Sequence, residues 1–537
     1  MKRLIILVAL VAILAILAAC GAPATPAPAP TSAPAAQPTS APAPTSAPAQ
    51  PTSAPQPTTA APTQAATTAA QPTTAATEAA TTAPQATTAA TEAATTAAQP
   101  TTAPSAGADN TAGANEANAR AAGLTFLADA YAGKYKGKTV NMTGTQAGPD
   151  AEKMNNNFKA FSDATGIQVV YTGGKEFEAN ITAQLQAGNA PDLIDFPQPG
   201  FLAGFVKKGQ IVDASKLVPM EWLNKNYSPD WIEMATMPGP DGKPIQAGVW
   251  HRSFLKSLVW YPKKQFDDAG YKVPTTWDEL MALTDQIVKD GDTPWCIGIS
   301  SGAATGWPAT DWTEDLMLRT TSPENYDKWV RGELKFDSPE VKKAINTFAP
   351  IWTTDADVFG GRKAIAVTDF GKSVLPMFEN PPKCWLHRQA DFITSFFPAG
   401  KTFGTDYDFF YLPPVDPQYG KPVLVAGDIF AATNDKPETA AVLQYISTGE
   451  GVKWWLGQGG AIGMQKDVDP SWYGDPVEKK AAEIVSQATT VRFDASDQMP
   501  GAVGAGSFWK GMTDWVSGAA DLDTVLKAID ASWPKAP

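Results

Sequence analysis

Aromatic side chains stand beside acids and amides at several places in the C-terminal four hundred residues. Gly306-Trp-Pro-Ala-Thr-Asp-Trp312 combines Trp307 and Trp312 with the acid Asp311, and Phe196-Pro-Gln198 places an amide directly after a predicted strand. Flat rings bind apolar C–H faces, whereas carboxylates and amides bind hydroxyl groups. These residue types favour non-covalent binding of a small hydroxyl-bearing molecule. A polar loop cap explains Gln198 equally well, and a place in the core explains either tryptophan.

The same acids raise the alternative of an exported enzyme. Asp311, Glu314 and Asp315 lie in one short segment, and a glycosidase needs two carboxylates at a defined separation that the sequence does not give. The chain contains no Gly-x-Ser-x-Gly elbow, His-Glu-x-x-His helix or phosphate loop. Its only histidines, His251 and His387, have no metal-ligand spacing. The sequence therefore predicts no catalytic residue, no metal and no cofactor.

Segments of helical and strand period alternate in the part of the chain that carries these residues. Residues 150–164 have apolar side chains at helical spacing, and 167–171 have the pattern of a strand. A second helical stripe runs over 177–185 and ends near Gly188, before a strand at 192–196. This order predicts an α/β fold with mainly parallel sheets. Loops at the carboxyl ends of parallel strands would then gather the candidate side chains at one edge.

The N-terminus predicts export. Lys2 and Arg3 precede an uncharged apolar run from Leu4 to Leu17, too short to span a bilayer comfortably. Leu17-Ala-Ala-Cys20 resembles a bacterial lipobox, in which the cysteine is acylated. We therefore expect residues 1–20 to be a lipoprotein signal peptide and Cys20 to anchor the protein on the extracytoplasmic face of the cell membrane. The alternative is a signal peptide with an incidental cysteine.

Residues 21–120 are predicted to be a disordered Ala/Pro/Thr-rich tether. No aromatic residue occurs between Cys20 and Phe126, so this stretch has nothing with which to build a core. As a random coil it would span about 55 Å. The whole chain has 42 basic and 55 acidic side chains, which argues against a nucleic-acid partner.

Two cysteines remain if Cys20 carries lipid. Cys296 and Cys384 would then be a pair in an oxidising compartment, where a disulfide is expected. Such a disulfide would raise the free energy of unfolding by on the order of 4 kcal/mol in the chain-entropy model. Two buried free thiols are the alternative.

Five motifs occur in the order found in the family 1 extracellular solute-binding proteins, the maltose-binding-protein-like receptors of ABC importers. The motifs that carry the resemblance are Gly188–Gly200 with its Pro-Asp-hydrophobic core, Ser257–Lys263, Pro274-Thr-Thr-Trp-Asp-Glu-Leu280, Phe378–Pro382, and Val425–Phe430 followed by Asn434–Pro437. Three further blocks resemble the α-glucoside-binding subgroup: Trp295–Gly298 with Gly306–Trp312, Pro382–Cys384, and Phe493–Gly501 with Phe508–Gly511.

The resemblance implies two α/β lobes joined by a hinge, with the ligand in the cleft between them. One lobe should hold 137–252 and 414–460, and the other 257–412 and 464–537. It further implies a monomeric receptor that delivers a carbohydrate, an α-glucoside or another oligosaccharide, to the permease subunits of an ABC transporter. The membrane contact would be through the N-terminal lipid only.

Five more candidate ligand contacts follow from the resemblance. Asp428 is the leading one, because it ends a strand of small residues where the family places ligand-contacting groups. Asp494 and Asp497 are expected near the cleft. Trp250 lies at the expected first crossing between lobes, where hinge packing is the alternative, and Arg388 could face the ligand or balance a neighbouring acid.

Two rival functions keep the same fold. A surface adhesin or scaffold would have a filled or apolar cleft and bind no small solute. A receptor for a different solute would take an oligopeptide, a polyamine or a phosphate ester. The cleft's local charge decides between these solutes, and the sequence does not give it.

Overall fold

The computed structural model describes residues 106–535, with side chains from residue 113 onward. The expected signal peptide, Cys20 and the tether as far as residue 105 lie outside the described residues.

A seven-stranded sheet forms the centre of one lobe. Its strand order is β11-β6-β10-β3-β1-β2, and β12 pairs with β10. Its strands are β1 (Thr139–Gly144), β2 (Gln168–Tyr171), β3 (Leu193–Phe196), β6 (Val249–Leu255), β10 (Pro422–Ala432), β11 (Ile462–Gly463) and β12 (Thr490–Phe493).

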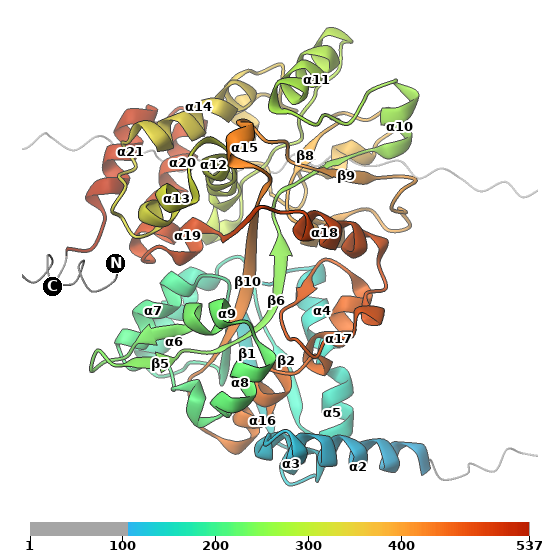
Figure 1. The fold of residues 1–537 in the computed structure, drawn as a ribbon, viewed down its shortest axis with the longest axis vertical. Helices are drawn as coiled ribbons and strands as arrows, with labels where there is room; N and C mark the ends of the chain where they lie inside the picture. The colour runs from blue at the N-terminus through green and yellow to red at the C-terminus, as the bar shows by residue number, and fades with distance from the viewer. Residues whose placement is uncertain (1–105, 536–537) are drawn as a thin grey trace, which may run out of the picture. The chain divides into compact units, whose positions relative to one another are not determined.

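The prediction of mainly parallel sheets is wrong. β1 is parallel to β2 and β3, but β10 is antiparallel to both β3 and β6. β6 and β10 run between the lobes in Figure 1, one leaving the large sheet and the other returning to it. A chain that crosses between lobes and comes back pairs antiparallel with its outgoing strand.

Two smaller sheets complete the strands. β7 (Leu258–Tyr261) lies between β8 (His387–Arg388) and β9 (Asp408–Tyr411), and both pairings are antiparallel. β4 (Thr236–Pro238) and β5 (Pro244–Gln246) form a separate antiparallel pair.

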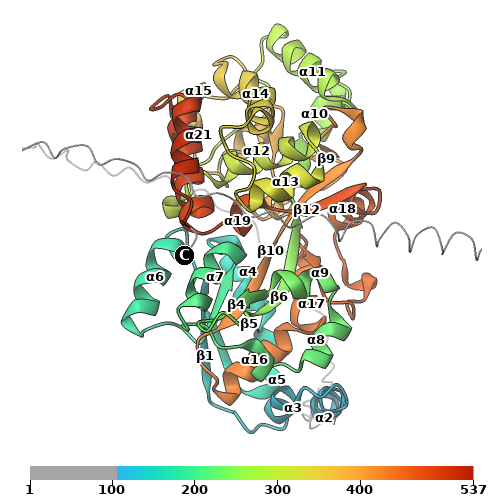
Figure 2. The same cartoon turned by 60° about the vertical axis from the view of Figure 1, so that its left-hand side comes forward.

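Helices surround these sheets in two lobes, one above the other in Figures 1 and 2. The lobe with the large sheet carries α2 (Ala106–Ala121), α3 (Thr125–Tyr131), α4 (Pro149–Asn157), α5 (Lys159–Thr165), α6 (Phe177–Ala187), α7 (Pro199–Lys207), α8 (Met220–Asn226), α9 (Pro229–Met234), α16 (Pro437–Ile446) and α17 (Glu450–Gln458). The other carries α10 (Lys263–Asp268), α11 (Trp277–Lys289), α12 (Trp307–Thr320), α13 (Pro323–Val330), α14 (Pro339–Thr353), α15 (Arg362–Ile365), α20 (Trp509–Ser517) and α21 (Leu522–Ala531). α18 (Pro476–Ser486) and α19 (Ala495–Gln498) lie where the lobes meet.

Local sequence signals explain several of these boundaries. α6 buries Phe177, Ile181 and Leu185, and it ends at Gly188, whose φ of 71° suits glycine. Thr276 caps α11 by accepting a hydrogen bond from the Glu279 N–H at 3.2 Å. The helix expected over 150–164 is instead two helices, α4 and α5, that meet at a buried phenylalanine.

The folded part begins earlier than the sequence suggested. Residues 106–120, expected to belong to the tether, lie in α2, and α3 also precedes residue 137. The Leu127 N–H donates to Gln444 Oε1 at 2.9 Å, which ties α3 to α16. Leu124 and Leu127 are buried in the core of this lobe, so a few apolar residues suffice to dock the segment.

The predicted disulfide between Cys296 and Cys384 is confirmed. It links two segments separated by 88 residues, and the Cys296 N–H also donates to the Leu386 carbonyl at 2.8 Å.

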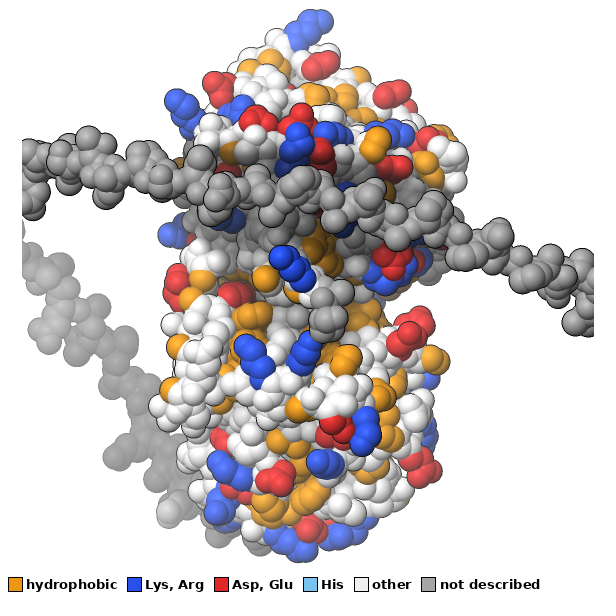
Figure 3. Space-filling view, turned by 90° about the vertical axis from the view of Figure 1, so that its left-hand side faces the viewer, with side chains coloured by type: hydrophobic (Ala, Val, Ile, Leu, Met, Phe, Trp, Pro, Cys, Tyr) orange, Lys and Arg blue, Asp and Glu red, His pale blue; other side chains and the backbone are white. Residues whose placement is uncertain are grey.

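None of the helices within residues 106–535 is long and apolar enough to cross a bilayer. On the face drawn in Figure 3, basic and acidic side chains of the described residues are interspersed.

Candidate functional site

A cavity of about 130 Å³ lies between the two lobes. A buried water needs about 10–15 Å³ on this measure, so the cavity has room for roughly ten water-sized groups. It is lined by Thr145, Gln146, Ala147, Asp150, Lys175, Glu178, Pro197, Gln198, Phe254, Lys256, Ser301, Ala304, Trp307, Phe370, Phe392, Phe396, Ala426, Asp428, Asp494, Ser496, Asp497 and Trp509. The residues after β1 and β3 are among them, as expected for the carboxyl ends of parallel strands.

Five aromatic rings form a continuous wall along one side of the cavity. The Trp307 ring lies 5.1 Å from the Phe370 ring and 6.0 Å from the Phe392 ring, centroid to centroid. Phe254 extends the wall from Phe392 at 5.5 Å, and Phe396 extends it from Phe370 at 5.3 Å. The wall offers apolar faces without closing the cavity, because Trp307 remains partly exposed.

Asp428 is held from behind by an ion pair. It faces Arg252 across the β10–β6 pairing, and the Arg252 guanidinium contacts Asp428 Oδ2. Gln146 Nε2 donates to the same oxygen at 3.2 Å, which leaves Asp428 Oδ1 buried and without a partner. Burial raises the pKa of Asp428, and the Arg252 charge opposes that rise. The free oxygen is available to a ligand.

Asp494 and Asp497 lie at the start of α19 and differ in their surroundings. Asp494 accepts from Lys256 Nζ, from Ser496 Oγ at 2.9 Å and from the Asp497 N–H at 3.1 Å. Burial alone would raise the pKa of Asp494, but the Lys256 charge and hydrogen bonds from Glu314, Lys256 and the Asp497 N–H lower it to about 2. The Asp497 carboxyl has no hydrogen-bond donor among the described residues, and burial, followed by the Asp494 charge, raises its pKa. Asp497 is the less satisfied of the two.

Glu178 and Gln198 form a second polar group. Gln198 Nε2 donates to Glu178 Oε1 at 3.0 Å, while Gln198 Oε1 and Glu178 Oε2 are buried without partners. The stem of Glu178 is partly exposed, but burial of its carboxyl raises its pKa to about 7.

The structure brings five of the nine predicted ligand contacts to the cavity wall. These are Gln198, Trp307, Asp428, Asp494 and Asp497.

Trp250 and Trp312 lie elsewhere. Trp250 packs between Trp231 and Phe493, with ring centroids at 5.1 and 5.6 Å, and its indole N–H donates to the Trp231 carbonyl. The segment expected to be a loop around Trp312 is the first part of α12. Five residues along a helix turn the side chain by about 140°, so Trp307 faces the cavity while Trp312 faces the core.

Asp311 and Arg388 belong to a buried ion network behind the cavity. Asp311 accepts from Lys256 Nζ at 2.7 Å, and it lies 3.3 Å from Arg388 Nη1. Arg388 Nη2 also donates to Asp315 Oδ2 at 2.8 Å. None of Asp311, Glu314 and Asp315, the acids considered for hydrolysis, lines the cavity.

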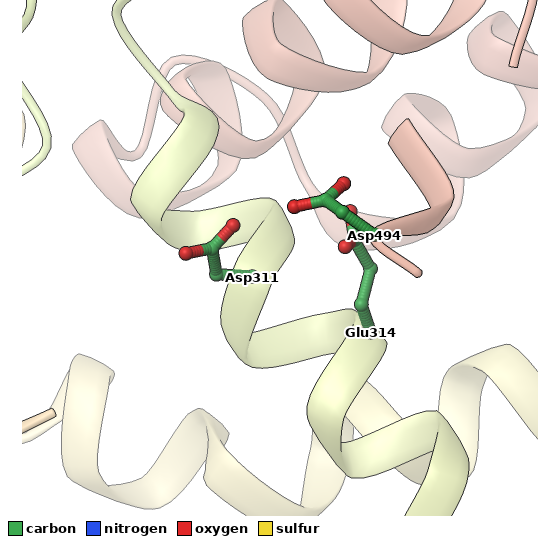
Figure 4. A group of neighbouring side chains, drawn as sticks. All are labelled: Asp311, Glu314 and Asp494. Atoms are coloured by element: carbon green, nitrogen blue, oxygen red, sulfur yellow. The ribbon is translucent and has the colours of Figure 1, made fainter. Parts of the chain in front are cut away.

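Three carboxyl groups of this region lie close enough to consider a metal. Asp311 and Glu314 project from α12 toward Asp494, with oxygens within 4.8 Å of one another (Figure 4). The Lys256 ammonium already contacts Asp311 and Asp494, and the Glu314 carboxyl accepts from the backbone N–H groups of 495 and 496. Lys256 thus already supplies a positive charge to two of the three carboxyl groups.

Sequence reasoning missed most of the aromatic wall and several polar residues, among them Asp150, Lys175, Glu178 and Lys256. Phe392 and Phe396 gave no periodic signal, because they lie in a 3₁₀ helix, where residues three apart rather than four apart share a face. Lys256 gave none, because an isolated lysine in sequence is usually exposed.

Known proteins place the chain in a family. The family model described as bacterial extracellular solute-binding protein matches residues 147–462. The osmoprotective compounds-binding protein GgtB of Synechocystis is 42% identical over 398 residues, which cover 74% of this chain and 93% of that protein. The alpha-glucosides-binding periplasmic protein AglE of Rhizobium meliloti is 43% identical, with 74% and 87% covered.

Solved structures share the fold at low sequence identity. The bacterial solute receptor AcbH, described as preferring b-D-galactopyranose, matches with a TM-score of 0.62 at 18% identity over 73% of this chain and 98% of that one. Maltose-bound MalE3 of T. maritima matches with a TM-score of 0.57 at 14% identity, with the same coverage. The two lobes, the cavity between them and the sequence relatives together show that this chain belongs to the bacterial extracellular solute-binding proteins.

Proposed function

We propose that the protein is the carbohydrate receptor of an ABC importer, and that it takes an α-glucoside or another oligosaccharide. The observation that carries this proposal is the cavity's composition. An aromatic wall lies in the same cavity as buried carboxyl and amide oxygens that have no partner in the protein. A sugar ring satisfies both, because its C–H faces pack on aromatic rings while its hydroxyls donate to free oxygens.

The site residues in this proposal are those on the cavity wall. Trp307 serves as the platform, and Asp428, Asp497 and Gln198 accept from ligand hydroxyls. Asp494 positions Asp497, because its Oδ1 accepts the Asp497 N–H. Trp250, Trp312, Asp311 and Arg388 do not line the cavity and are not part of the proposed site.

The names of the relatives support the sugar class. One relative is named for binding α-glucosides, and another for binding osmoprotective compounds. The name of AglE therefore supports an α-glucoside as the proposed ligand.

The division into lobes supports closure around the ligand. We propose one lobe of 137–252 with 414–460, preceded by α2 and α3, and another of 257–412 with 464–537. One ion pair among the described residues, Lys175 with Asp369, joins the two. Lys153 Nζ donates across the same boundary to Ser395 Oγ at 2.8 Å. Closure would form these contacts, and opening would release the unaltered solute to permease subunits.

Titration calorimetry with maltose, trehalose, sucrose and raffinose tests the proposal. Trp307→Ala should weaken binding of whichever sugar binds by at least about tenfold, since stacking contacts contribute about 0.5–1.5 kcal/mol beyond the area they bury. Trp472→Ala, a partly exposed tryptophan outside the cavity, is the matched control. Unchanged affinity in Trp307→Ala, or release of cleavage products during the titration, would contradict the receptor proposed here.

We also propose a lipid anchor at Cys20 that holds a monomer on the extracytoplasmic face of the membrane. The lipobox-like Leu17-Ala-Ala-Cys20 supports this. Metabolic labelling with a palmitate analogue should mark the wild type but not Cys20→Ser. Label retained in the variant would contradict acylation at this residue.

A further inference from the structure

The cavity presents hydrogen-bond acceptors rather than donors. Among its lining side chains, the buried polar atoms without a partner are all oxygens: Asp150 Oδ1, Glu178 Oε2, Gln198 Oε1 and Asp428 Oδ1. The Gln198 amide orientation is set by Glu178, which accepts from its Nε2. An unsatisfied buried acceptor is costly, so a ligand that donates to these atoms gains the most.

The two lysines on the wall are already engaged. Lys256 donates to Asp311 at 2.7 Å and also to Asp494. Lys175 pairs with Asp369, which does not line the cavity. Each ammonium group therefore already has a carboxylate partner, with which a negatively charged solute would have to compete.

Acids outnumber these lysines on the wall. Asp150, Glu178, Asp428, Asp494 and Asp497 line the cavity, and only Asp494 has its carboxylate fully engaged by donors. A phosphate or carboxylate placed here would lie against carboxyl oxygens and would gain no unpaired cationic partner. Burial of a negative charge without such a partner is strongly disfavoured.

We infer that the cavity selects its solute by hydrogen-bond donors. It admits neutral polyols and polyols in which an ammonium group replaces one hydroxyl, and it rejects those that carry a phosphate or a carboxylate. This inference rests on the proposed carbohydrate function and narrows it to neutral and cationic sugars.

Calorimetry on the wild-type protein tests the inference with six probes. The neutral sugars are trehalose and maltose, the amino sugar is trehalosamine, the matched anions are trehalose 6-phosphate and maltobionic acid, and the polyamine is spermidine. Neutral or amino sugars should bind at least about a hundredfold more tightly than the matched anions. An anion that binds within tenfold of its neutral counterpart overturns the inference and leaves the carbohydrate function standing. Binding of spermidine alone overturns the carbohydrate function and supports donor selection, and no binding by any probe contradicts both.

A gain-of-function variant tests the role of the engaged lysine. Asp369→Asn removes the charge that holds Lys175 but keeps Oδ1, which accepts from the backbone N–H groups of 371 and 372 at 3.1 and 3.2 Å. The freed ammonium should raise affinity for trehalose 6-phosphate at least about tenfold and change that for trehalose less than about threefold. Asp406→Asn, which breaks the surface pair with Lys401, is the control. Unchanged discrimination in Asp369→Asn would contradict the inference.

Discussion

Two neighbouring groups of buried acids have different roles in this molecule: one is paired within the protein, and the other is left open to a ligand. Asp315 accepts from Arg319 and from Ser257 through Oδ1, and from Arg388 through Oδ2. Asp497 is also buried, yet no donor among the described residues reaches its carboxyl. Burial of an acid therefore does not identify a binding residue. The number of partners supplied by the protein separates a structural carboxylate from one that is kept for a ligand.

Removing a fully paired acid should have the largest effect. Asp315→Leu leaves Arg319 and Arg388 buried without their shared counter-charge, so the free energy of unfolding should fall by about 3–5 kcal/mol. Urea unfolding followed by fluorescence measures this. A loss below about 1 kcal/mol would mean that the paired group is not structural, and the contrast with Asp497 would fail.

Removing the disulfide should come next. Replacing Cys296 and Cys384 by serine opens a loop of 88 residues, which should lower the free energy of unfolding by about 2–4 kcal/mol. The Cys296 carbonyl accepts from His387 Nδ1 at 2.8 Å, and His387 directly precedes Arg388. The lost stability should therefore come from the region of the fully paired acids and not from the cavity. Sugar affinity measured below the unfolding transition should change less than about threefold. A larger change in affinity would show that the two groups of acids are not independent.

Asp497→Asn should have the reverse profile. Sugar affinity should fall about 10- to 100-fold, because the amide replaces one acceptor oxygen by an N–H₂ group that cannot accept from a ligand hydroxyl. Stability of the free protein should stay within about 1 kcal/mol or rise, because a buried carboxyl with a raised pKa is relieved. Calorimetry and urea unfolding of the same preparation measure both quantities. A stability loss without an affinity loss would place Asp497 with the structural acids.

The smallest effect expected is a change in pH dependence. The pKa of Glu178 is raised from 4.5 to about 7, mainly by burial, so the folded state keeps a proton that the unfolded chain has lost. Its contribution to stability is therefore present below about pH 4.5 and is lost as the pH rises to about 7. Glu178→Gln should make the fall in stability over this range shallower, by up to about 1.4 kcal/mol per pH unit. Urea midpoints at several pH values measure the slope, and an identical slope in the variant would contradict the assignment.

Local signals predicted the parts of the fold that depend on neighbours in sequence. The apolar stripe that ends at Gly188 is confirmed as a helix boundary. The strands expected at 167–171 and 192–196 are confirmed within one residue. The mixed pairing of the large sheet was not predicted, because strand direction depends on how the chain crosses between lobes.

Only about half of the candidate site could be predicted, because the sequence does not show which of two similar side chains faces the cavity. Trp307 and Trp312 are equivalent as residue types, and only the position of α12 between cavity and core assigns one to each. Asp428 and Asp311 are likewise both acids near the lobe boundary, but only Asp428 keeps a buried oxygen on the cavity wall.

The sequence by itself determined the alternation of helices and strands, the pair of cysteines and the motifs that match the family. Only the tertiary structure decided which polar atoms are free. Gln146 and Asp428 are 282 residues apart, and Lys256 and Asp494 are 238 apart, yet each pair forms a hydrogen bond in the same small space. A free oxygen is defined by the donors that do not reach it, and those donors come from segments that only folding brings together.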